Sequence, residues 1–376
     1  MKNNKRHARR IPWITIALVL ILLGAIMIGT GWISGFRGGS LIIEDGRLRV
    51  VHDWSGEIET TFMEIPDGGR FTDIHIRARA PTILVRPADP DAPLSLKFTN
   101  LEANVEYSGN QLIIDTRDHE RRNDIPIIHF NYRGPDPRGV IVVHLPAGKA
   151  DSVRITNTSG NIRIDDISIT LLEVRSTSGR ISGRNLNFTN GTLESSSGNI
   201  NLNDASWNDL NARTISGQIR IAGADIGEGS TQLHTTSGNI QMDDISATLL
   251  EARSTSGRIG GRNLSFTSGT LESSSGNISL NDVSWNNLNA RTISGQIRIA
   301  GADIREGGTQ LQATSGNINL EVRSRRDDFT YNLTATAGSV RINGERLQGR
   351  MGVGGRGEHP ITMNVTSGNI RLDFDP

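Results

Sequence analysis

A Ser-Gly turn recurs along the C-terminal part of this chain at a nearly constant spacing, and Ala replaces its Ser once. A period near 20 residues is typical of a solenoid, whose repeats cannot bury their apolar faces alone and must stack on one another. The intervals are 19 or 21 residues up to Gly316, and the two longest, 22 and 30 residues, fall at the C-terminal end. The turn glycines are Gly160, Gly179, Gly198, Gly217, Gly238, Gly257, Gly276, Gly295, Gly316, Gly338 and Gly368.

Four successive turns form a block that is present twice in tandem, at 169–246 and 247–324. The two copies are identical at 61 of the 78 aligned positions, including Arg220 and Arg298 in the outward phase. A catalytic site is a single constellation and gains little from such a copy, whereas a binding rod gains reach or repeated positions.

The residues around each turn follow a period of two, which indicates strands. The second residue after the glycine is Ile in ten coils and Val in one, so we expect this column to face inward. We expect the turn to need a residue with positive φ, which glycine adopts most easily. The Asn that often follows the glycine is the next most tolerant residue type for this conformation. The third residue before the glycine also falls in the inward phase and is Ser or Thr, which predicts a buried ladder of hydroxyls. These are Ser176, Ser195, Thr214, Thr235, Ser254, Ser273 and Thr292.

The predicted fold is therefore all-β, a right- or left-handed β-solenoid wound from a single strand with about 20 residues per coil. The solenoid repeats are assigned to 151–376. Residues 40–150 are also β-rich, and form either irregular strands or the first coils. Short runs rich in Ile, Leu and Val alternate there with Gly- and Pro-containing turns.

The N-terminus predicts a membrane anchor. Residues 1–10 form a basic tail, and residues 11–35 contain no charged side chain and are long enough for a transmembrane helix. Trp13 and Trp32 suit the two interfaces, and the basic tail is expected to stay in the cytoplasm. This places the protein in the cytoplasmic membrane as a single-pass chain with an extracytoplasmic β-domain. A cleaved signal peptide is the alternative, but its usual A-x-A-like site is absent.

Composition removes several function classes. The chain has no cysteine, which excludes disulfides and Cys-ligated metals, and 40 basic residues balance 40 acidic ones, so no basic field favours nucleic acid. Acidic pairs such as Asp165-Asp166 and Asp243-Asp244 could suggest calcium, but Arg184 and Arg262 take the equivalent places on the intervening coils. We therefore expect no metal, no cofactor and no catalytic residue. The polar cluster 118–124, with His129 after it, is interpreted as a solvated loop.

A candidate ligand-contact surface lies one residue before the hydroxyl ladder, where the side chains should face outward. Opposite charges alternate there on adjacent coils, with His234 between the two copies. Two equivalent tryptophans could stack on sugar rings or pack the solenoid's corner. The candidate residues are Arg175, Glu194, Arg213, Trp207, Arg253, Glu272, Arg291 and Trp285.

The x-Ser-Gly-x-Ile-x-Ile/Leu units, with the lead-in segments 71–78 and 140–155, resemble the "putative adhesin" or toastrack family of β-strand repeats. The resemblance covers roughly residues 70–376. It implies an envelope-located β-solenoid for adhesion or interaction, often associated with envelope-stress membrane systems, and it supplies no catalytic residues.

We therefore expect a non-catalytic adhesion or interaction scaffold at the cell envelope, with an envelope polysaccharide or a surface protein as partner. One alternative is a self-assembling filament, because we expect the last residues, 370–376, to form an exposed terminal coil with few features that block edge pairing. An envelope-stress accessory protein is a second alternative. A glycan-processing β-helix enzyme is a third, and would need clustered carboxylates in a groove.

Overall fold

The computed structural model describes residues 39–44, 47–51, 60–65, 71–117, 128–130 and 139–375. The chain divides into two compact units, Met1–Ile58 with Arg121–Pro137, and Glu59–Glu120 with Arg138–Pro376. In the first unit, β1 (Gly39–Glu44) pairs antiparallel with both β2 (Arg47–Val51) and β9 (Ile128–Phe130).

Several sequence predictions lie outside the described residues. These are the tail 1–10, the span 11–35 and the cluster 118–124, and for His129 only the backbone is described. Within the described residues, no helix has the length and apolar character needed to cross a membrane. The anchor and the polar loop therefore stay predictions.

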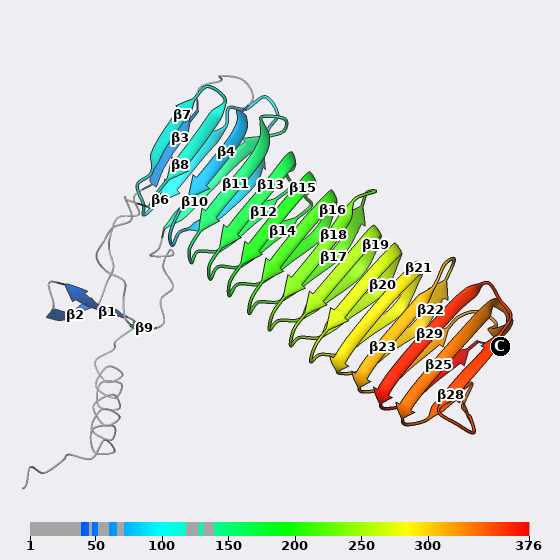
Figure 1. Ribbon diagram of the computed structural model, residues 1–376. Coiled ribbons are helices and arrows are strands. Elements are labelled where there is room, and N and C mark those ends of the chain that lie inside the picture. Colours follow the sequence, from blue (N-terminus) through cyan, green and yellow to red (C-terminus); the bar gives the residue numbers. More distant parts are fainter. Residues whose placement is uncertain are drawn as a thin grey trace, which may run out of the picture. The chain divides into compact units, whose positions relative to one another are not determined.

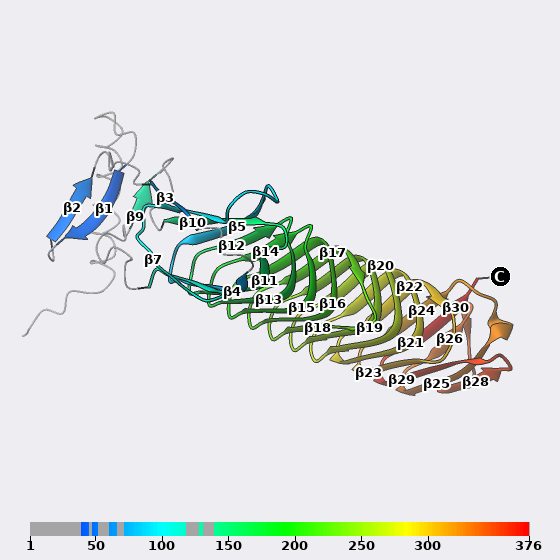
Figure 2. The ribbon, with the colours of Figure 1, turned by 90° about the horizontal axis from the view of Figure 1, so that it is seen from above.

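The second unit is a stack of β-coils, as expected from the repeat (Figures 1 and 2). Its 27 strands form one continuous hydrogen-bonded sheet that winds around an apolar core. The strands of the stack are β4 (Phe71–Arg77), β5 (Thr82–Ala88), β10 (Val140–Pro146), β11 (Ala150–Asn157), β12 (Ile162–Asp165), β13 (Ser168–Ser176), β14 (Ile181–Arg184), β15 (Asn187–Ser195), β16 (Ile200–Thr214), β17 (Ile219–Ile226), β18 (Ser230–Thr235), β19 (Ile240–Ser254), β20 (Ile259–Ser273), β21 (Ile278–Ser294), β22 (Ile297–Ile304), β23 (Thr309–Ser315) and β24 (Ile318–Val322).

The remaining strands of this unit lie at the two ends of the stack, with one short 3-10 turn, η1 (Arg326–Asp328), before the last group. They are β3 (Thr60–Glu64), β6 (Ser95–Thr99), β7 (Asn104–Ser108), β8 (Gln111–Asp115), β25 (Phe329–Ala337), β26 (Val340–Ile342), β27 (Glu345–Arg346), β28 (Met351–Gly355), β29 (His359–Ser367) and β30 (Ile370–Phe374).

The strands pair in parallel with the register that the glycine spacing predicts. Ile181 lies beside Ile200, Ile200 beside Ile219, and Ile219 beside Ile240. Each interval between turn glycines from Gly160 to Gly316 thus returns the chain to the same place one coil further on. The all-β prediction is confirmed. Strands β4 and β5 pair in parallel with β11 and β12, so residues 71–88 are also part of the stack.

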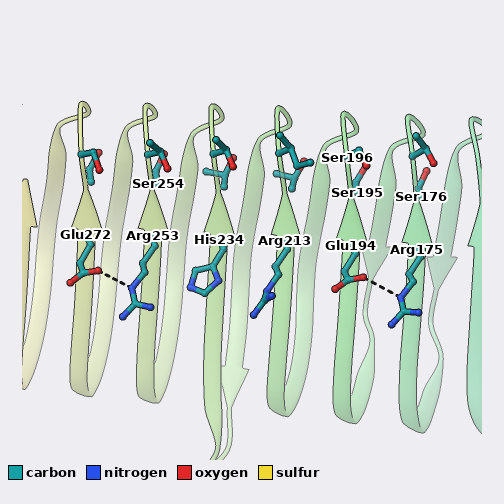
Figure 3. Close-up of a pocket in the computed structure, with 18 of the residues that line it drawn as sticks. Arg175, Ser176, Glu194, Ser195, Ser196, Arg213, His234, Arg253, Ser254 and Glu272 are labelled. Atoms are coloured by element: carbon teal, nitrogen blue, oxygen red, sulfur yellow. Dashed lines mark hydrogen bonds and ion pairs between the residues drawn. The ribbon is translucent and has the colours of Figure 1, made fainter.

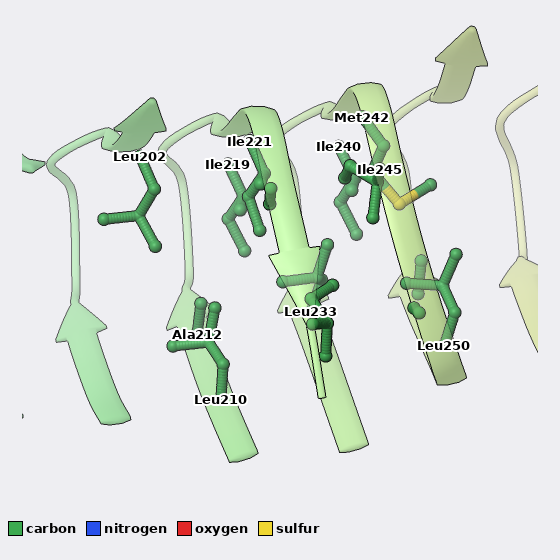
Figure 4. Close-up of a cluster of buried hydrophobic side chains, with 14 of the residues drawn as sticks. Leu202, Leu210, Ala212, Ile219, Ile221, Leu233, Ile240, Met242, Ile245 and Leu250 are labelled. Carbon is green, nitrogen blue, oxygen red and sulfur yellow. The ribbon is translucent and has the colours of Figure 1, made fainter. Parts of the chain in front are cut away.

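The apolar core is built from the predicted inward columns (Figure 4). The column two residues after the glycine is at most 1% exposed from Ile162 to Ile370. Gly183 and Gly261 interrupt the next inward column, and each leaves room for a leucine of its own coil, Leu186 or Leu264, whose Cδ1 lies 2.5 Å from where a Cβ would be.

The turn glycines are required for a different reason from the one predicted. Of the eleven, only Gly316 and Gly368 have a φ in the left-handed range. A Cβ on any of the others would lie 1.7–2.2 Å from a backbone carbonyl oxygen of the neighbouring turn, too close for any side chain. The requirement therefore comes from the close stacking of successive turns, and the positive-φ explanation was wrong for most coils.

Positive φ is found at the opposite corner of the coil. Asp166, Asn185, Asp204, Asp244, Asn263 and Asp282 have φ between 50° and 58°. Asn and Asp are the non-glycine residues that best tolerate this region, and Gly223 and Gly301 take the same place in two coils. The second member of each acidic pair is thus a corner residue.

The first members of two of these pairs are held by arginine. Arg262 Nε lies 3.2 Å from Asp243 Oδ1, and Arg163 Nε lies 2.5 Å from Asp165 Oδ2. The acidic pairs therefore have structural roles. No group of three or more His, Asp or Glu side chains that could hold a metal occurs within the described ranges.

The buried hydroxyl ladder is present as predicted, with exposures of 0–8%. Four of these hydroxyls, those of Thr214, Thr235, Ser254 and Ser273, connect their own turn to the turn of the preceding coil. Thr214 Oγ1 accepts the N–H of Gly217 at 3.0 Å and donates to the carbonyl of Gly198 at 3.1 Å. The Asn after the glycine adds a second link, since Asn199 Oδ1 accepts the N–H of Gln218 at 2.8 Å. Polar groups that would be costly to bury are thus satisfied between coils.

The C-terminal end of the stack does not follow the order of the sequence. Strand β30 lies between β24 and β26, and β29 lies between β23 and β25. The last coil of the chain is therefore inserted inside the stack, and residues 370–374 are not the exposed terminal coil that we expected. The outermost coil is formed by β25 and β26, and its edges are covered by the antiparallel strands β28 and β27.

Candidate functional site

A groove runs along one side of the stack, beside the row of turns (Figure 3). It has a volume of about 940 Å³ and is lined from Thr156 to Ile293 by the ends of β11, β13, β15, β16, β18, β19, β20 and β21. Because every coil contributes the same positions, the lining repeats along the groove about every 4.8 Å.

One wall of the groove is the predicted outward row. Arg175, Glu194, Arg213, His234, Arg253, Glu272 and Arg291 all line it. Register places them side by side on successive coils, as Figure 3 shows for the first six. We refer to these seven residues as the charged row.

Two ion pairs repeat within the charged row at the same place in each block. Arg175 Nε lies 3.1 Å from Glu194 Oε2, and Arg253 Nε lies 2.8 Å from Glu272 Oε2. These pairs are exposed, so each contributes at most about 1 kcal/mol. Their alternation nevertheless favours the observed register over one that places like charges together.

The other wall was not anticipated from the sequence. It consists of the residues two positions after the charged row: Thr177, Ser196, Ile215, Thr236, Thr255, Ser274 and Ile293. We refer to these as the hydroxyl row. Five of the seven side chains carry hydroxyls, and the two isoleucines occur once per block. The signal was present in the sequence, because period two places these residues outward as surely as the charged row.

Trp207 and Trp285 do not belong to the contact surface, which corrects our inclusion of them. They are 2% and 0% exposed. Each indole stacks on a phenylalanine of the preceding coil, Phe188 or Phe266, with ring centroids 5.6 and 6.2 Å apart. Trp207 Nε1 also donates to Thr231 Oγ1 at 2.9 Å, and Trp285 makes the same bond to Thr309. Both tryptophans therefore pack the corner of the solenoid.

A second polar cluster lies on the N-terminal coils. Ser152 Oγ donates to Asp73 Oδ1 at 2.6 Å, and Arg154 Nε lies 3.2 Å from the same oxygen. Burial lowers the pKa of His75, and the neighbouring Arg77 guanidinium lowers it further. The side-chain hydrogen bond from Arg117 lowers the pKa of Asp115. The carboxylates of this cluster are engaged by arginines.

Comparison with protein families identifies the family to which this chain belongs. The model described as Toastrack DUF4097 matches residues 71–231 and again 207–373. This chain belongs to the toastrack family. The two overlapping matches together span nearly the whole β-solenoid, and the expectation drawn from the repeat units is confirmed. No curated protein matches the chain.

Several solved structures match the chain at low similarity. One is described as a "putative cell adhesion protein" from Clostridium sporogenes ATCC 15579, with 10% identity, a TM-score of 0.22, and coverage of 85% of this chain and 100% of that one. Another is a "putative lipid binding protein" from Parabacteroides distasonis ATCC 8503, with 13% identity, a TM-score of 0.32, and coverage of 85% and 98%. A "putative adhesin" from Bacteroides fragilis NCTC 9343 has 12% identity, a TM-score of 0.28, and the same coverage.

Proposed function

We propose that this toastrack protein is a non-catalytic adhesion or interaction scaffold that binds an elongated polymer along the groove. The observation that carries the proposal is that the first three coils of each block line the groove with the same charged-row and hydroxyl-row residues, including the Arg175–Glu194 and Arg253–Glu272 pairs. A linear ligand with a repeating unit can use such a surface more than once, which raises its overall affinity without any new kind of contact.

The chemistry of the groove favours binding over catalysis. Its two glutamates, Glu194 and Glu272, are each held by an arginine, and they lie four coils apart, about 19 Å along the stack. A glycosidase needs its two carboxyl groups within about 10 Å of each other. The lining repeats a simple pattern, whereas a catalytic site is one constellation of different groups.

The location forms part of the same proposal. The uncharged segment 11–35 would anchor the chain in the cytoplasmic membrane, and the β-solenoid would extend outside the cytoplasm, where envelope polysaccharides and surface proteins are found. Protease treatment of intact cells or spheroplasts tests this orientation, because the β-solenoid should be digested while a tag on residue 1 stays protected.

The function is tested by shortening the groove. Deletion of residues 169–246 joins two equivalent junctions, since 161–168 and 239–246 both read Asn-Ile-x-x-Asp-Asp-Ile-Ser. Binding of the full chain and of this shorter chain to purified envelope polysaccharide and to whole cells is then compared, with circular dichroism as the control for folding. We expect weaker binding by the shorter chain. Equal binding by both chains would contradict a repeat-borne site.

A second candidate function, assembly into a filament, is favoured by one observation. Strand β28 forms an outer edge that pairs with β25, and its Met351 and Val353 are 62% and 74% exposed. Exposed apolar edge strands are sites of edge-to-edge association. Sedimentation over a range of concentrations tests this: a mass that rises with concentration and falls again in Val353→Glu supports assembly, and a constant monomeric mass removes it.

A further inference from the structure

The charges of the groove are not balanced evenly along its length. Arg175 and Arg253 each pair with a glutamate of the next coil, and Arg253 Nη1 also lies 2.6 Å from Glu251. These positions are locally neutral. The excess of positive charge in the charged row therefore falls on its other two arginines.

Arg213 and Arg291 are those two arginines, and they occupy the same place in the two blocks. Both are exposed, and neither has a carboxylate within 4 Å in the part of the chain that the structure describes. Arg213 Nε donates to Asn211 Oδ1 at 2.9 Å on its own strand. This bond orients the guanidinium through Nε alone, and Figure 3 shows Arg213 in the row between Glu194 and His234.

Each of these arginines has an exposed isoleucine beside it in the groove. Ile215 is 55% exposed and Ile293 is 47% exposed, two residues after Arg213 and Arg291. Side chains two apart on an extended strand point to the same side, at a separation of about 7 Å. Hydroxyls of the hydroxyl row flank Ile215 on both neighbouring coils, through Ser196 and Thr236, and Ser274 lies on the coil before Ile293.

The two Arg–Ile positions are four coils apart, so they are separated by about 19 Å along the groove. They have the same residues at the same register position because the block is copied. A ligand that satisfies one position and continues in a straight line can satisfy the other.

We propose that Arg213–Ile215 and Arg291–Ile293 are two equivalent subsites for a linear acidic polysaccharide that lies along the groove. In each subsite the guanidinium would bind a carboxylate of the polymer through two parallel N–H···O bonds. The isoleucine would contact the apolar face of a sugar ring, and the hydroxyl row would bond to sugar hydroxyls. This inference rests on the proposed function and specifies its ligand.

A polypeptide ligand fits these observations less well. The strands that line the groove already have a parallel neighbour on each side, so the groove offers no free strand edge for an extended peptide. A peptide lying there would leave many backbone groups to be satisfied by side chains alone. Sugar hydroxyls match the Ser and Thr lining directly.

The experiment measures binding of the full chain to polygalacturonate, to its methyl ester as an uncharged polysaccharide, and to polyglutamate as an acidic polypeptide. The variants are Arg213→Gln, Arg291→Gln and the double variant. Arg258→Gln is the matched control, because Arg258 is exposed but lies outside the groove. We expect polygalacturonate to bind in preference to both other polymers, about tenfold weaker binding for each single variant, and loss of at least a hundredfold for the double variant.

Three results would overturn the inference. These are equal binding of the methyl ester, equal or tighter binding of polyglutamate, and double-variant binding as tight as that of Arg258→Gln. The proposed function is tested separately by deletion of residues 169–246. If the deletion weakens binding to cells while the double variant does not, the groove function stands and the acidic subsites are wrong.

Discussion

Substitution of a turn glycine by alanine should open the solenoid at that coil. In Gly257→Ala the new Cβ would lie 1.7 Å from the carbonyl oxygen of Gly238, whereas real Cβ atoms essentially never come closer than 3.0 Å to such an atom. The two turns must therefore separate. The hydrogen bonds that cross the gap include Ser254 Oγ to Gly238 O at 3.1 Å, Thr255 N to Thr235 O at 3.2 Å, and Ser256 N to Thr236 O at 2.9 Å.

Each lost bond costs about 1 kcal/mol, and more where a buried group is left unpaired. Alanine restores about 0.4–1 kcal/mol by restricting the unfolded chain. We therefore expect a loss of about 2–4 kcal/mol in the free energy of unfolding, measured by urea denaturation, with faster hydrogen exchange at residues 254–259. The control is Gly308→Ala, where the nearest atom, Pro360 Cγ, is 3.4 Å away. Equal stability of the two variants would refute the close-stacking explanation.

Three further predictions follow from the packing. Truncation after residue 358 removes the inserted β29 and β30, and hydrogen exchange should show β25 and β26 unprotected, whereas truncation after Phe374 should leave them protected. Trp285→Phe leaves Thr309 Oγ1 without its 2.9 Å partner and should cost about 1–3 kcal/mol in thermal unfolding, and added Thr309→Val should recover part of that loss. Folding lowers the pKa of His75, so the unfolded chain binds more protons than the folded chain as the pH falls below 6.5. Acidification should therefore reduce the stability of the unsubstituted chain more than it reduces the stability of the His75→Gln variant. Identical pH profiles of stability for the two chains would contradict this.

The stacking of the coils could be predicted because it depends on which side chains face inward. The alternation of apolar and polar residues in the sequence indicates this. The residue two positions after each turn glycine and the residue three positions before it are predicted to face inward. Ile200 and Thr214 are examples of these two columns, and both are buried. The charged row follows from the same count. The resulting groove could not be predicted, because it also requires the shape of the turns.

Of the two interpretations of the tryptophans, corner packing is correct, because the strand bends before it reaches them. Counting backward by twos from Thr214 makes Leu210 inward and Trp207 outward. In the structure Asn208 and Asp209 both face solvent, which resets the phase at the bend and turns Trp207 into the core. The bend arises where the coil closes around its own interior.

The turn glycines and the C-terminal insertion depend on distances between coils, which a single repeat does not contain. A glycine that prevents a clash with the next turn has the same sequence signature as a glycine that needs positive φ. Likewise, the order β24-β30-β26 is one of several ways to place a final coil of suitable pattern. Sequence periodicity specifies which residues share a column but not which coil is the last in space.

The central claim, that the groove is the binding surface, is tested most directly by placing one bulky side chain inside it and one just outside. Ser274→Trp would project into the groove, and Ser279→Trp would project from the strand on the other side of the same turn, which does not line the groove. Binding to purified envelope polysaccharide is then measured for both variants. The account predicts that Ser274→Trp loses binding while Ser279→Trp binds like the unsubstituted chain. Binding retained by Ser274→Trp, or lost by Ser279→Trp alone, would contradict it.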